Sequence, residues 1–207
     1  FLENMSHEIR TPITSIMGYL TLLQENSLNI EKRKKYTTRA YANTKKMITA
    51  LNSFLTLLKA EKGNLKLNKK TVLPFHQFMK EIISNYLPDF EIKKIHFYYK
   101  TNAKDSFNID YHLESLKIIL NNLISNAIKY SNSNKNIYLN IHFTEKSIEI
   151  IIKDEGFGIS EEDKEMIFTR FYQIKQNSTT GGFGIGLALL AELVNKLNGV
   201  VRVESEI

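Results

Sequence analysis

Residues 1–62 carry an apolar pattern that repeats every three or four positions, and this pattern constrains the fold more than any other feature of the chain. Such spacing is typical of helices with one buried stripe. The apolar positions are Leu2, Met5, Ile9, Ile16, Leu20 and Leu23, then Tyr36, Ala40, Met47, Leu51, Phe54 and Leu58. Residues 25–29 interrupt the pattern, so we predict two long helices joined by a short turn. A lone helical hairpin cannot bury both of its faces well, so we expect two hairpins to pair into a dimeric four-helix bundle.

The pattern changes after residue 62, where Gly63 is suited to end a helix. Residues 65–67 alternate like a strand, and Pro74 is suited to start a helix. We predict helices from 74, over 113–128 and over 185–197, and strands over 95–99, 137–143, 147–153 and 200–203. Because helices and strands interleave, this part is predicted to be a mixed two-layer α/β domain. The expected organisation is a helical hairpin over 1–62, a linker over 63–73 and the α/β domain over 74–207.

The composition excludes several classes of protein. The chain has 207 residues, of which 43% are hydrophobic and 24% are charged, which is ordinary for a globular protein and not for a disordered one. It has no cysteine, which excludes disulfides, thiolate metal sites and cysteine nucleophiles. No apolar run approaches the roughly 18 residues of a spanning helix. The first residues already resemble the middle of a helix, so we expect the chain to be a piece of a longer protein.

The positive charge is concentrated in the first segment. Residues 1–62 hold 10 basic and 5 acidic residues, whereas residues 63–207 hold 18 and 17. A basic segment can bind nucleic acid, an anionic membrane or an acidic protein. An exposed helix face without a partner would show the same charge, and both interpretations remain open.

The segment from Ser6 to Pro12 carries the first chemical signal. With the apolar stripe on the bundle seam, His7 falls on the opposite side of the helix, and Thr11 lies four residues on, on the same face. Glu8 is adjacent to His7. A carboxylate that accepts the proton of one ring nitrogen makes the other nitrogen a better nucleophile. A plain surface histidine is the alternative interpretation.

Two further clusters have residue types suited to a nucleotide. Asn122, Asn126 and Lys129 share one face of a predicted helix, where amide oxygens can ligate Mg²⁺ and the ammonium can meet phosphate. Asp154 follows a predicted strand, and Gly156 and Gly158 come directly after it. A carboxylate at a strand end can accept a hydrogen bond from an adenine amino group. Each cluster taken alone also fits an ordinary helix surface or turn.

An aromatic cluster and a glycine cluster follow. Ile167 to Tyr172 contains aromatic residues that suit the base of a mobile loop or a core. Residues 182–187 alternate glycine with apolar residues at the start of a predicted helix, where backbone N–H groups can hold phosphate. The Gly-x-Gly-x-Gly spacing differs from the dinucleotide-binding fingerprint.

Together, these clusters resemble the catalytic core of the sensor histidine kinases of two-component signalling. Residues 6–12 resemble the phosphoacceptor box, and residues 122–130 the asparagine box. The remaining clusters resemble the first glycine box (154–158), the aromatic box (168–171) and the second glycine box (182–187). Five boxes in the family's order are a specific signal that covers essentially the whole chain. The resemblance implies a dimeric phosphoacceptor hairpin followed by an ATP-binding domain of the Bergerat type.

For the first domain, the resemblance implies that His7 is the phosphoacceptor and that Glu8 orients and activates it. Thr11 would position water when the core removes phosphate from its partner. The phosphoryl group would come from Mg²⁺-ATP and would pass to an aspartate of a response-regulator receiver domain. Five cations of the second helix would favour such an acidic partner, namely Lys32, Arg33, Lys34, Lys35 and Arg39.

For the second domain, the resemblance implies that Asn126, with Asn122, ligates Mg²⁺ and that Lys129 contacts phosphate. Asp154 would bind the adenine amino group. The phosphates would lie between Gly182, Gly184 and Gly186, and Arg170 and Lys175 are the cations of the expected lid. By the same resemblance, the nucleotide site would also include Tyr130, Gly156, Gly158, Ile159, Phe168, Phe183, Ile185 and Leu187. One departure is that the chain stops at Ile207, where the family usually adds one more strand.

Other functions are disfavoured. A non-catalytic ATP-binding scaffold would not need every box, and a chaperone or topoisomerase type of ATPase would lack the hairpin with His7. Nucleic-acid binding is suggested only by the basic isoelectric point, and the near-neutral second segment contains no reading motif. We expect a cytoplasmic fragment without membrane contact, from a parent anchored in a membrane.

Overall fold

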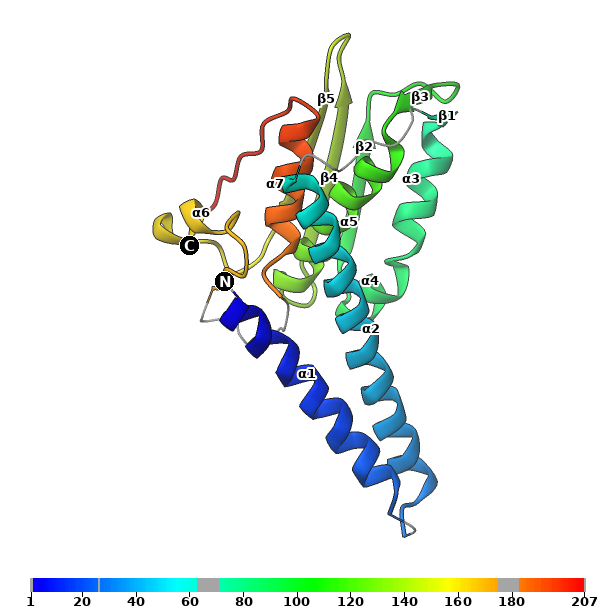
Figure 1. Cartoon of the computed structure of the whole chain (residues 1–207). Coiled ribbons are helices and arrows are strands. Elements are labelled where there is room, and N and C mark those ends of the chain that lie inside the picture. The colour runs from blue at the N-terminus through cyan, green and yellow to red at the C-terminus, as the bar shows by residue number, and fades with distance from the viewer. Residues whose placement is uncertain (1, 26, 63–70, 175–182, 207) are drawn as a thin grey trace. The chain divides into compact units, whose positions relative to one another are not determined.

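The computed structural model describes residues 2–25, 27–62, 71–174 and 183–206, with the backbone alone at 2–8, 61 and 71. Its helices and strands are shown in Figure 1. They form two compact units. The first contains residues 1–65 and 166–192, and the second contains residues 66–165 and 193–207.

The first unit contains the two predicted long helices, α1 (Leu2–Leu23) and α2 (Ile30–Glu61). They are joined at 24–29, where the apolar pattern breaks, so the predicted hairpin is confirmed. Asn29 is the N-cap of α2, because its side-chain oxygen accepts a hydrogen bond from the Lys32 backbone N–H at 2.9 Å. Asparagine at this position satisfies a backbone donor that the helix leaves unpaired. The turn therefore ends where the sequence supplies a cap.

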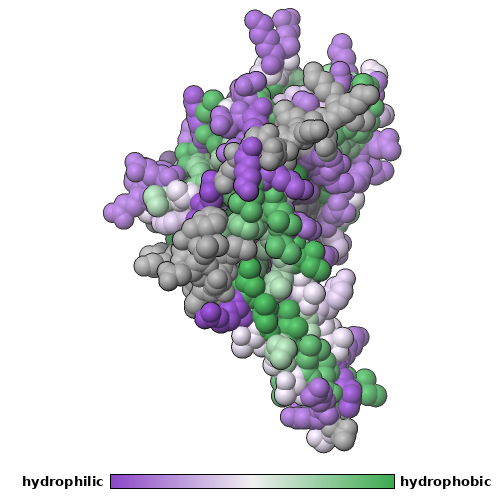
Figure 2. Space-filling view, in the orientation of Figure 1, coloured by the Kyte–Doolittle hydropathy of each residue, from purple (hydrophilic) through white to green (hydrophobic). Residues whose placement is uncertain are grey.

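The hairpin is held by a contact between its helices, yet it leaves many apolar side chains in solvent. The rings of Tyr19 and Tyr36 stack with centroids 6.0 Å apart. Figure 2 shows apolar side chains gathered in a stripe along the hairpin. The exposed large apolar residues of the hairpin are Ile13, Met17, Leu20, Leu22, Ile30, Tyr41, Ile48, Leu51 and Leu55. An apolar surface of this extent is characteristic of a helix face that binds a partner.

The second unit alternates helices and strands, as predicted. Its elements are β1 (Thr71–Pro74), α3 (Phe75–Ser84), α4 (Leu87–Lys93), β2 (His96–Thr101), β3 (Asn108–Tyr111), α5 (Leu113–Tyr130), β4 (Asn136–Phe143), β5 (Ile148–Asp154) and most of α6 (Glu161–Met166). A further helix, α7 (Gly186–Lys196), begins in the first unit and ends in the second.

The main sheet has the order β2-β4-β5, with β2 parallel and β5 antiparallel to β4, and β1 pairs with β3 in a separate antiparallel sheet. Alternate residues of β4 point into the core, where Ile137, Leu139 and Ile141 are almost fully buried. They belong to the same core cluster as apolar residues of α3 and α5, including Phe75, Met79, Ile82, Leu120 and Ile124. The predicted two-layer α/β domain is therefore confirmed.

Two expectations differ from the structure or fall outside it. The predicted strand at 200–203 is wrong, because residues 200–206 pair with no described strand and Val200 is 78% exposed. A strand is stabilised by the hydrogen-bond ladder to its neighbour, and apolar alternation alone does not supply one. The predicted helix stop at Gly63 and the alternation at 65–67 lie outside the described residues. None of the described helices has the length and apolar character needed to cross a bilayer.

Candidate functional site

The histidine segment lies on the first half of α1. His7 and Glu8 are part of this helix, and Thr11 follows one turn after His7. Residues four apart lie on the same face of a helix, so His7 and Thr11 share a face as predicted. Thr11 is exposed. Solvent can therefore reach this face of α1 at Thr11.

α5 presents its polar residues on the side opposite its buried residues. Leu120, Ile124 and Ala127 are buried, whereas Asn122, Asn126, Lys129 and Tyr130 are all half-buried. Burial of one face fixes the rotation of the helix, so the polar residues are held at the domain surface. The half-buried residues combine amide oxygens with an ammonium group, which suits a metal–phosphate ligand.

Two of these side chains already have partners within α5. The side-chain nitrogen of Asn122 donates to the Ile118 carbonyl at 2.9 Å. The side-chain oxygen of Asn122 is not used in this hydrogen bond. The Lys129 ammonium donates to the Tyr130 hydroxyl at 2.8 Å and lies 4.5 Å from the centroid of that ring. The cation is therefore held close to the helix by Tyr130.

Asp154 is the last residue of β5. Its Oδ1 atom accepts a hydrogen bond from the Gly156 backbone N–H at 2.9 Å. Partial burial raises the pKa of the Asp154 carboxyl above its ordinary value, and the Gly156 hydrogen bond opposes this rise. Among the described residues, no other hydrogen-bond donor to the Asp154 carboxylate is found.

Gly156 lies so close to the end of α5 that a side chain does not fit. It pairs with Ser131 in an isolated antiparallel bridge. A Cβ at position 156 would lie 2.6 Å from Asp154 Oδ1 and 2.8 Å from the Tyr130 carbonyl oxygen. Both distances are too short for any side chain, so glycine is required by the close approach of two backbones. The bridge joins the cluster on α5 to the cluster after β5.

The residues around this bridge are fixed by side chains that sequence reasoning missed. The Glu155 carboxylate accepts from the Asn136 side-chain amide at 2.9 Å and from the Asn136 backbone N–H at 3.2 Å. These hydrogen bonds lower the pKa of Glu155. The Ile159 backbone N–H donates to Ser205 Oγ at 2.9 Å, and Gly158 has a φ of 75°. No local pattern could reveal pairs so far apart in sequence.

The aromatic box and the second glycine box contact each other in the first unit. The Phe171 N–H donates to the Gly184 carbonyl at 2.7 Å. Gly184 has a φ of 61°, and a Cβ there would lie 2.6 Å from the Phe171 carbonyl carbon. Glycine is therefore required at 184 by both conformation and space.

The other residues of these two boxes are distributed between core and surface. Ile185 is buried, Phe168, Phe183, Gly186 and Leu187 are half-buried, and Arg170 is exposed. Lys175 and Gly182 were also predicted as site residues, and they lie outside the described residues. The lid predicted between Thr169 and Gly182 is therefore described only over residues 170–174.

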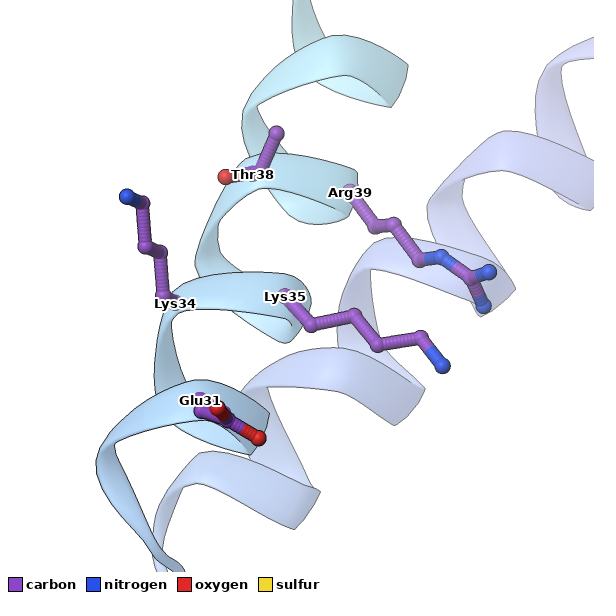
Figure 3. Close-up of a pocket in the computed structure, with 5 residues that line it drawn as sticks. All are labelled: Glu31, Lys34, Lys35, Thr38 and Arg39. Atoms are coloured by element: carbon purple, nitrogen blue, oxygen red, sulfur yellow. The ribbon is translucent and has the colours of Figure 1, made fainter.

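A shallow hollow on α2 is lined by charged side chains. Glu31, Lys34, Lys35, Thr38 and Arg39 form its wall. In Figure 3, Lys35 and Arg39 extend toward the same side of the helix, whereas Lys34 extends toward the other. All five residues are exposed. Cations therefore face solvent on two sides of this part of α2.

Comparisons with known families match both parts of the chain. Residues 1–63 match the His Kinase A (phospho-acceptor) domain. Residues 112–207 match the family of histidine kinase-, DNA gyrase B- and HSP90-like ATPases. The two models therefore cover the histidine segment and every predicted nucleotide cluster.

Individual relatives match over nearly the whole chain. Sensor histidine kinase YcbM of Bacillus subtilis is 32% identical over 99% of this chain and 66% of its own length. The chain spans between 17% and 66% of the first curated relatives it matches. Among solved structures, histidine kinase AdeS of Acinetobacter baumannii has a TM-score of 0.72 at 22% identity, over 97% of this chain and 91% of that one.

Histidine kinase ThkA, solved in complex with the response regulator protein TrrA, has a TM-score of 0.71 at 22% identity, over 96% of this chain and 55% of that one. At these identities the solved structures support the fold. The family models and the curated relatives agree with the box motifs and with the hairpin and α/β domain found here. This chain therefore belongs to the sensor histidine kinases of two-component signalling, with a phosphoacceptor hairpin followed by a Bergerat-type ATPase domain.

Proposed function

We propose that this chain is an active protein-histidine kinase core that phosphorylates His7 from ATP and passes the phosphoryl group to a receiver aspartate. The proposal rests chiefly on the Ser131–Gly156 bridge. This bridge joins the end of α5, with its amides and ammonium, to the turn after Asp154. One domain thereby holds residues for the two ends of a nucleotide in a fixed relation, as a positioning catalyst of phosphoryl transfer requires.

We assign the ends of the nucleotide as follows. The Asp154 carboxylate accepts a hydrogen bond from the adenine amino group, and Gly156 lets the backbone approach the base. The amide oxygens of Asn126 and Asn122 suit Mg²⁺, which prefers oxygen ligands and is commonly shared with substrate phosphates. When bound, the ion neutralises phosphate charge. The Lys129 ammonium turns from Tyr130 toward phosphate. By the family resemblance alone, Gly182, Gly184 and Gly186 would bracket the phosphates.

The transfer step exchanges one bond for another. The bond from the γ-phosphorus to the bridging oxygen of ADP breaks as a bond from phosphorus to a His7 ring nitrogen forms. Glu8 accepts the proton of the other ring nitrogen, which orients the ring and favours attack. When the core acts as a phosphatase, Thr11 positions the water that attacks the phosphorylated receiver. Arg170 or Lys175, the two cations of the predicted lid, would assist the transferring phosphate.

The hairpin is proposed to form a homodimer. Its exposed apolar stripe, visible in Figure 2, has the composition of a bundle seam. A second copy of the hairpin would cover this stripe and complete a four-helix bundle. We propose the domain limits 1–62 and 74–207 with a linker between them. We also propose a cytoplasmic location for this fragment within a parent protein anchored in a membrane.

The receiver is proposed to dock through acidic groups. The basic cluster, defined as Lys34, Lys35 and Arg39 of α2, is exposed. Receiver domains are acidic around their aspartate, so this cluster would steer them electrostatically. Arg33 has a separate role, since its guanidinium donates to the carbonyls of Glu25 and Leu28 in the hairpin turn.

One experiment tests the reaction and its acceptor together. The chain and its His7→Gln variant are incubated with Mg²⁺ and γ-labelled ATP, and ADP binding is measured in the same samples. We expect an acid-labile, alkali-stable label that is absent from His7→Gln. Binding without label would support a non-catalytic scaffold instead. Label retained in His7→Gln would overturn the assigned acceptor, and a wild-type chain that binds no ADP would overturn the nucleotide site.

A further inference from the structure

Lys93, the last residue of α4, places its side chain against the C-terminal end of α5. Its ammonium donates to the carbonyl of Ile128 at 2.6 Å, of Lys129 at 3.1 Å and of Ser131 at 3.0 Å. An ammonium has three donors, and each finds an acceptor here. The Lys93 side chain is half-buried, unlike its neighbour Lys94, which is exposed. Three acceptors on one ammonium mark a built contact and not a chance surface contact.

A cation stabilises a helix most strongly at its C-terminal end. The last carbonyls of an α-helix have no partner inside the helix, and they form the negative end of its dipole. The Ser131 N–H closes one turn by donating to the Ala127 carbonyl at 3.0 Å. Lys93 satisfies carbonyls beyond that turn. It therefore fixes how α5 ends.

The segment that Lys93 holds leads directly to Asp154. Ser131 is 2% exposed and forms the bridge to Gly156. Gly156 in turn donates to Asp154 Oδ1. The backbone of Lys93 adds a second hold, because its carbonyl accepts from the Asn134 N–H at 3.1 Å. Residues 128–134 are thus fixed from one residue of α4, between the α5 cluster and the turn after β5.

We propose that Lys93 is a positioning residue for nucleotide binding. It sets the spacing between the α5 face that carries Asn126 and Lys129 and the carboxylate of Asp154. The inference rests on the proposed function, since these residues must bind the two ends of one nucleotide. Without Lys93, each end still binds its part of the ligand, but the two no longer bind together at full strength.

α4 offers a matched control for a purely structural effect. Tyr86, which precedes α4, also holds α5, because its hydroxyl lies 3.0 Å from Asn121 Oδ1 and 3.2 Å from the Asn121 carbonyl oxygen. This contact is in the middle of α5, away from Ser131. Tyr86→Phe therefore removes a link to α5 without touching its end. Lys94→Met removes an equal charge without touching α5 contacts described here.

The test measures dissociation constants of the whole chain for Mg²⁺-ADP and for adenosine, at a temperature where every variant is folded. We expect Lys93→Met to weaken ADP binding roughly tenfold and adenosine binding less than about threefold, since adenosine needs only the Asp154 end. Tyr86→Phe and Lys94→Met should bind ADP as the wild-type chain does. Lys93→Arg, which keeps charge and donors, should recover most of the affinity.

Several results would overturn the inference. One is an unchanged affinity of Lys93→Met for ADP, and another is an equal loss in Tyr86→Phe, which would reduce Lys93 to a stabilising contact. An equal loss for adenosine and ADP would contradict the spacing role. If Lys93→Met does not fold, hydrogen exchange of the Gly156 amide is measured in Lys93→Arg and in the wild-type chain. We expect faster exchange in Lys93→Arg, because arginine keeps the geometry only in part. A wild-type chain without ADP affinity would refute the proposed function itself.

Discussion

Asp154 and Gly156 are locked together, since the Gly156 N–H donates to Asp154 Oδ1 at 2.9 Å and a Cβ at 156 would lie 2.6 Å from the same oxygen. The carboxylate is thereby aimed by the backbone that follows it. One oxygen of the carboxylate is used inside the protein, and we propose that the other accepts from the adenine. Mutations of Asp154 should therefore affect chiefly nucleotide binding, and mutations of Gly156 should affect chiefly stability.

Asp154→Asn is expected to lose nucleotide affinity while keeping the fold. The amide oxygen can still accept from Gly156, but the amide nitrogen then meets a donor of the adenine. Loss of a charged hydrogen bond of about 1.5–3 kcal/mol corresponds to roughly 10- to 150-fold weaker ADP binding, measured by calorimetry. Asp154→Glu, which keeps the charge but displaces it, is the companion variant. Full affinity in Asp154→Asn would contradict the adenine assignment.

The same variant should be at least as stable as the wild-type chain at neutral pH without nucleotide. Burial raises the pKa of Asp154 in the folded state, so the ionised carboxyl opposes folding above that pKa. This cost is removed as the pH falls through the folded pKa toward the unfolded value. On acidification, the melting temperature of the wild-type chain should therefore rise relative to that of Asp154→Asn. A neutral-pH loss of stability in Asp154→Asn would contradict this expectation.

Gly156→Ala is expected to destabilise the second unit by about 1–3 kcal/mol, the usual cost of forcing extra atoms into a packed site. The methyl would clash with the Tyr130 carbonyl oxygen as well as with Asp154. Urea unfolding measures the change. Gly18→Ala is the control, because a Cβ there meets nothing within 4 Å, and alanine inside α1 should add about 0.5–1 kcal/mol. Equal effects at both positions would contradict the close-approach argument.

Glu155→Gln is expected to change the acid side of the stability profile. Hydrogen bonds from the Asn136 side chain and backbone lower the pKa of Glu155 in the folded state. The stabilisation is present above the unfolded pKa and is lost as the pH falls through the folded pKa. The wild-type chain should therefore exceed Glu155→Gln in urea midpoint at pH 7, and the difference should shrink toward pH 3. A difference independent of pH would refute this linkage.

Neutralising the basic cluster is expected to slow transfer to the receiver without slowing phosphorylation of His7. Lys34, Lys35 and Arg39, changed together to Gln, should lower the transfer rate roughly tenfold at low salt, and added salt should remove the difference. Changing Lys45, Lys46 and Lys59 of the same helix to Gln is the matched control, since all three are exposed. Unaltered transfer at low salt would refute docking through this cluster.

Sequence patterns predicted the elements with strong periodicity. The helix expected over 113–128 extends over Leu113–Tyr130, and the strand expected over 137–143 begins one residue earlier. Both have long buried faces, so hydrophobicity and structure agree. The final strand failed because it needs a partner, which no local pattern encodes. β1, β3, α4 and α6 were not predicted, since each is at most seven residues long and owes its form to neighbours.

The sequence predicted which residue types form the candidate site, but it did not predict the side chains that hold them in place. Asn126 and Asp154 were found because their chemistry is legible in a short motif. Lys93 and Asn136 were not, because the groups they hold are 35 and 19 residues away in sequence. Such pairs are set by the packing of α4, α5 and the sheet. Motifs therefore indicate candidate ligand contacts, and only the fold identifies the residues that hold them in place.

The parallel pairing of β2 with β4 has a consequence for how the domain forms. Register pairs His96 with Asn136 and Thr101 with Ile141, so partners lie 40 residues apart. The intervening chain includes α5, which makes that helix the crossover between the strands. Closing the 40-residue loop costs entropy before the hydrogen bonds between the two strands can form. This cost slows the folding of such sheets. The helix with Asn126 and Lys129 is consequently part of the slow, cooperative step, so partly folded chains made during synthesis would have no preformed nucleotide site to occupy.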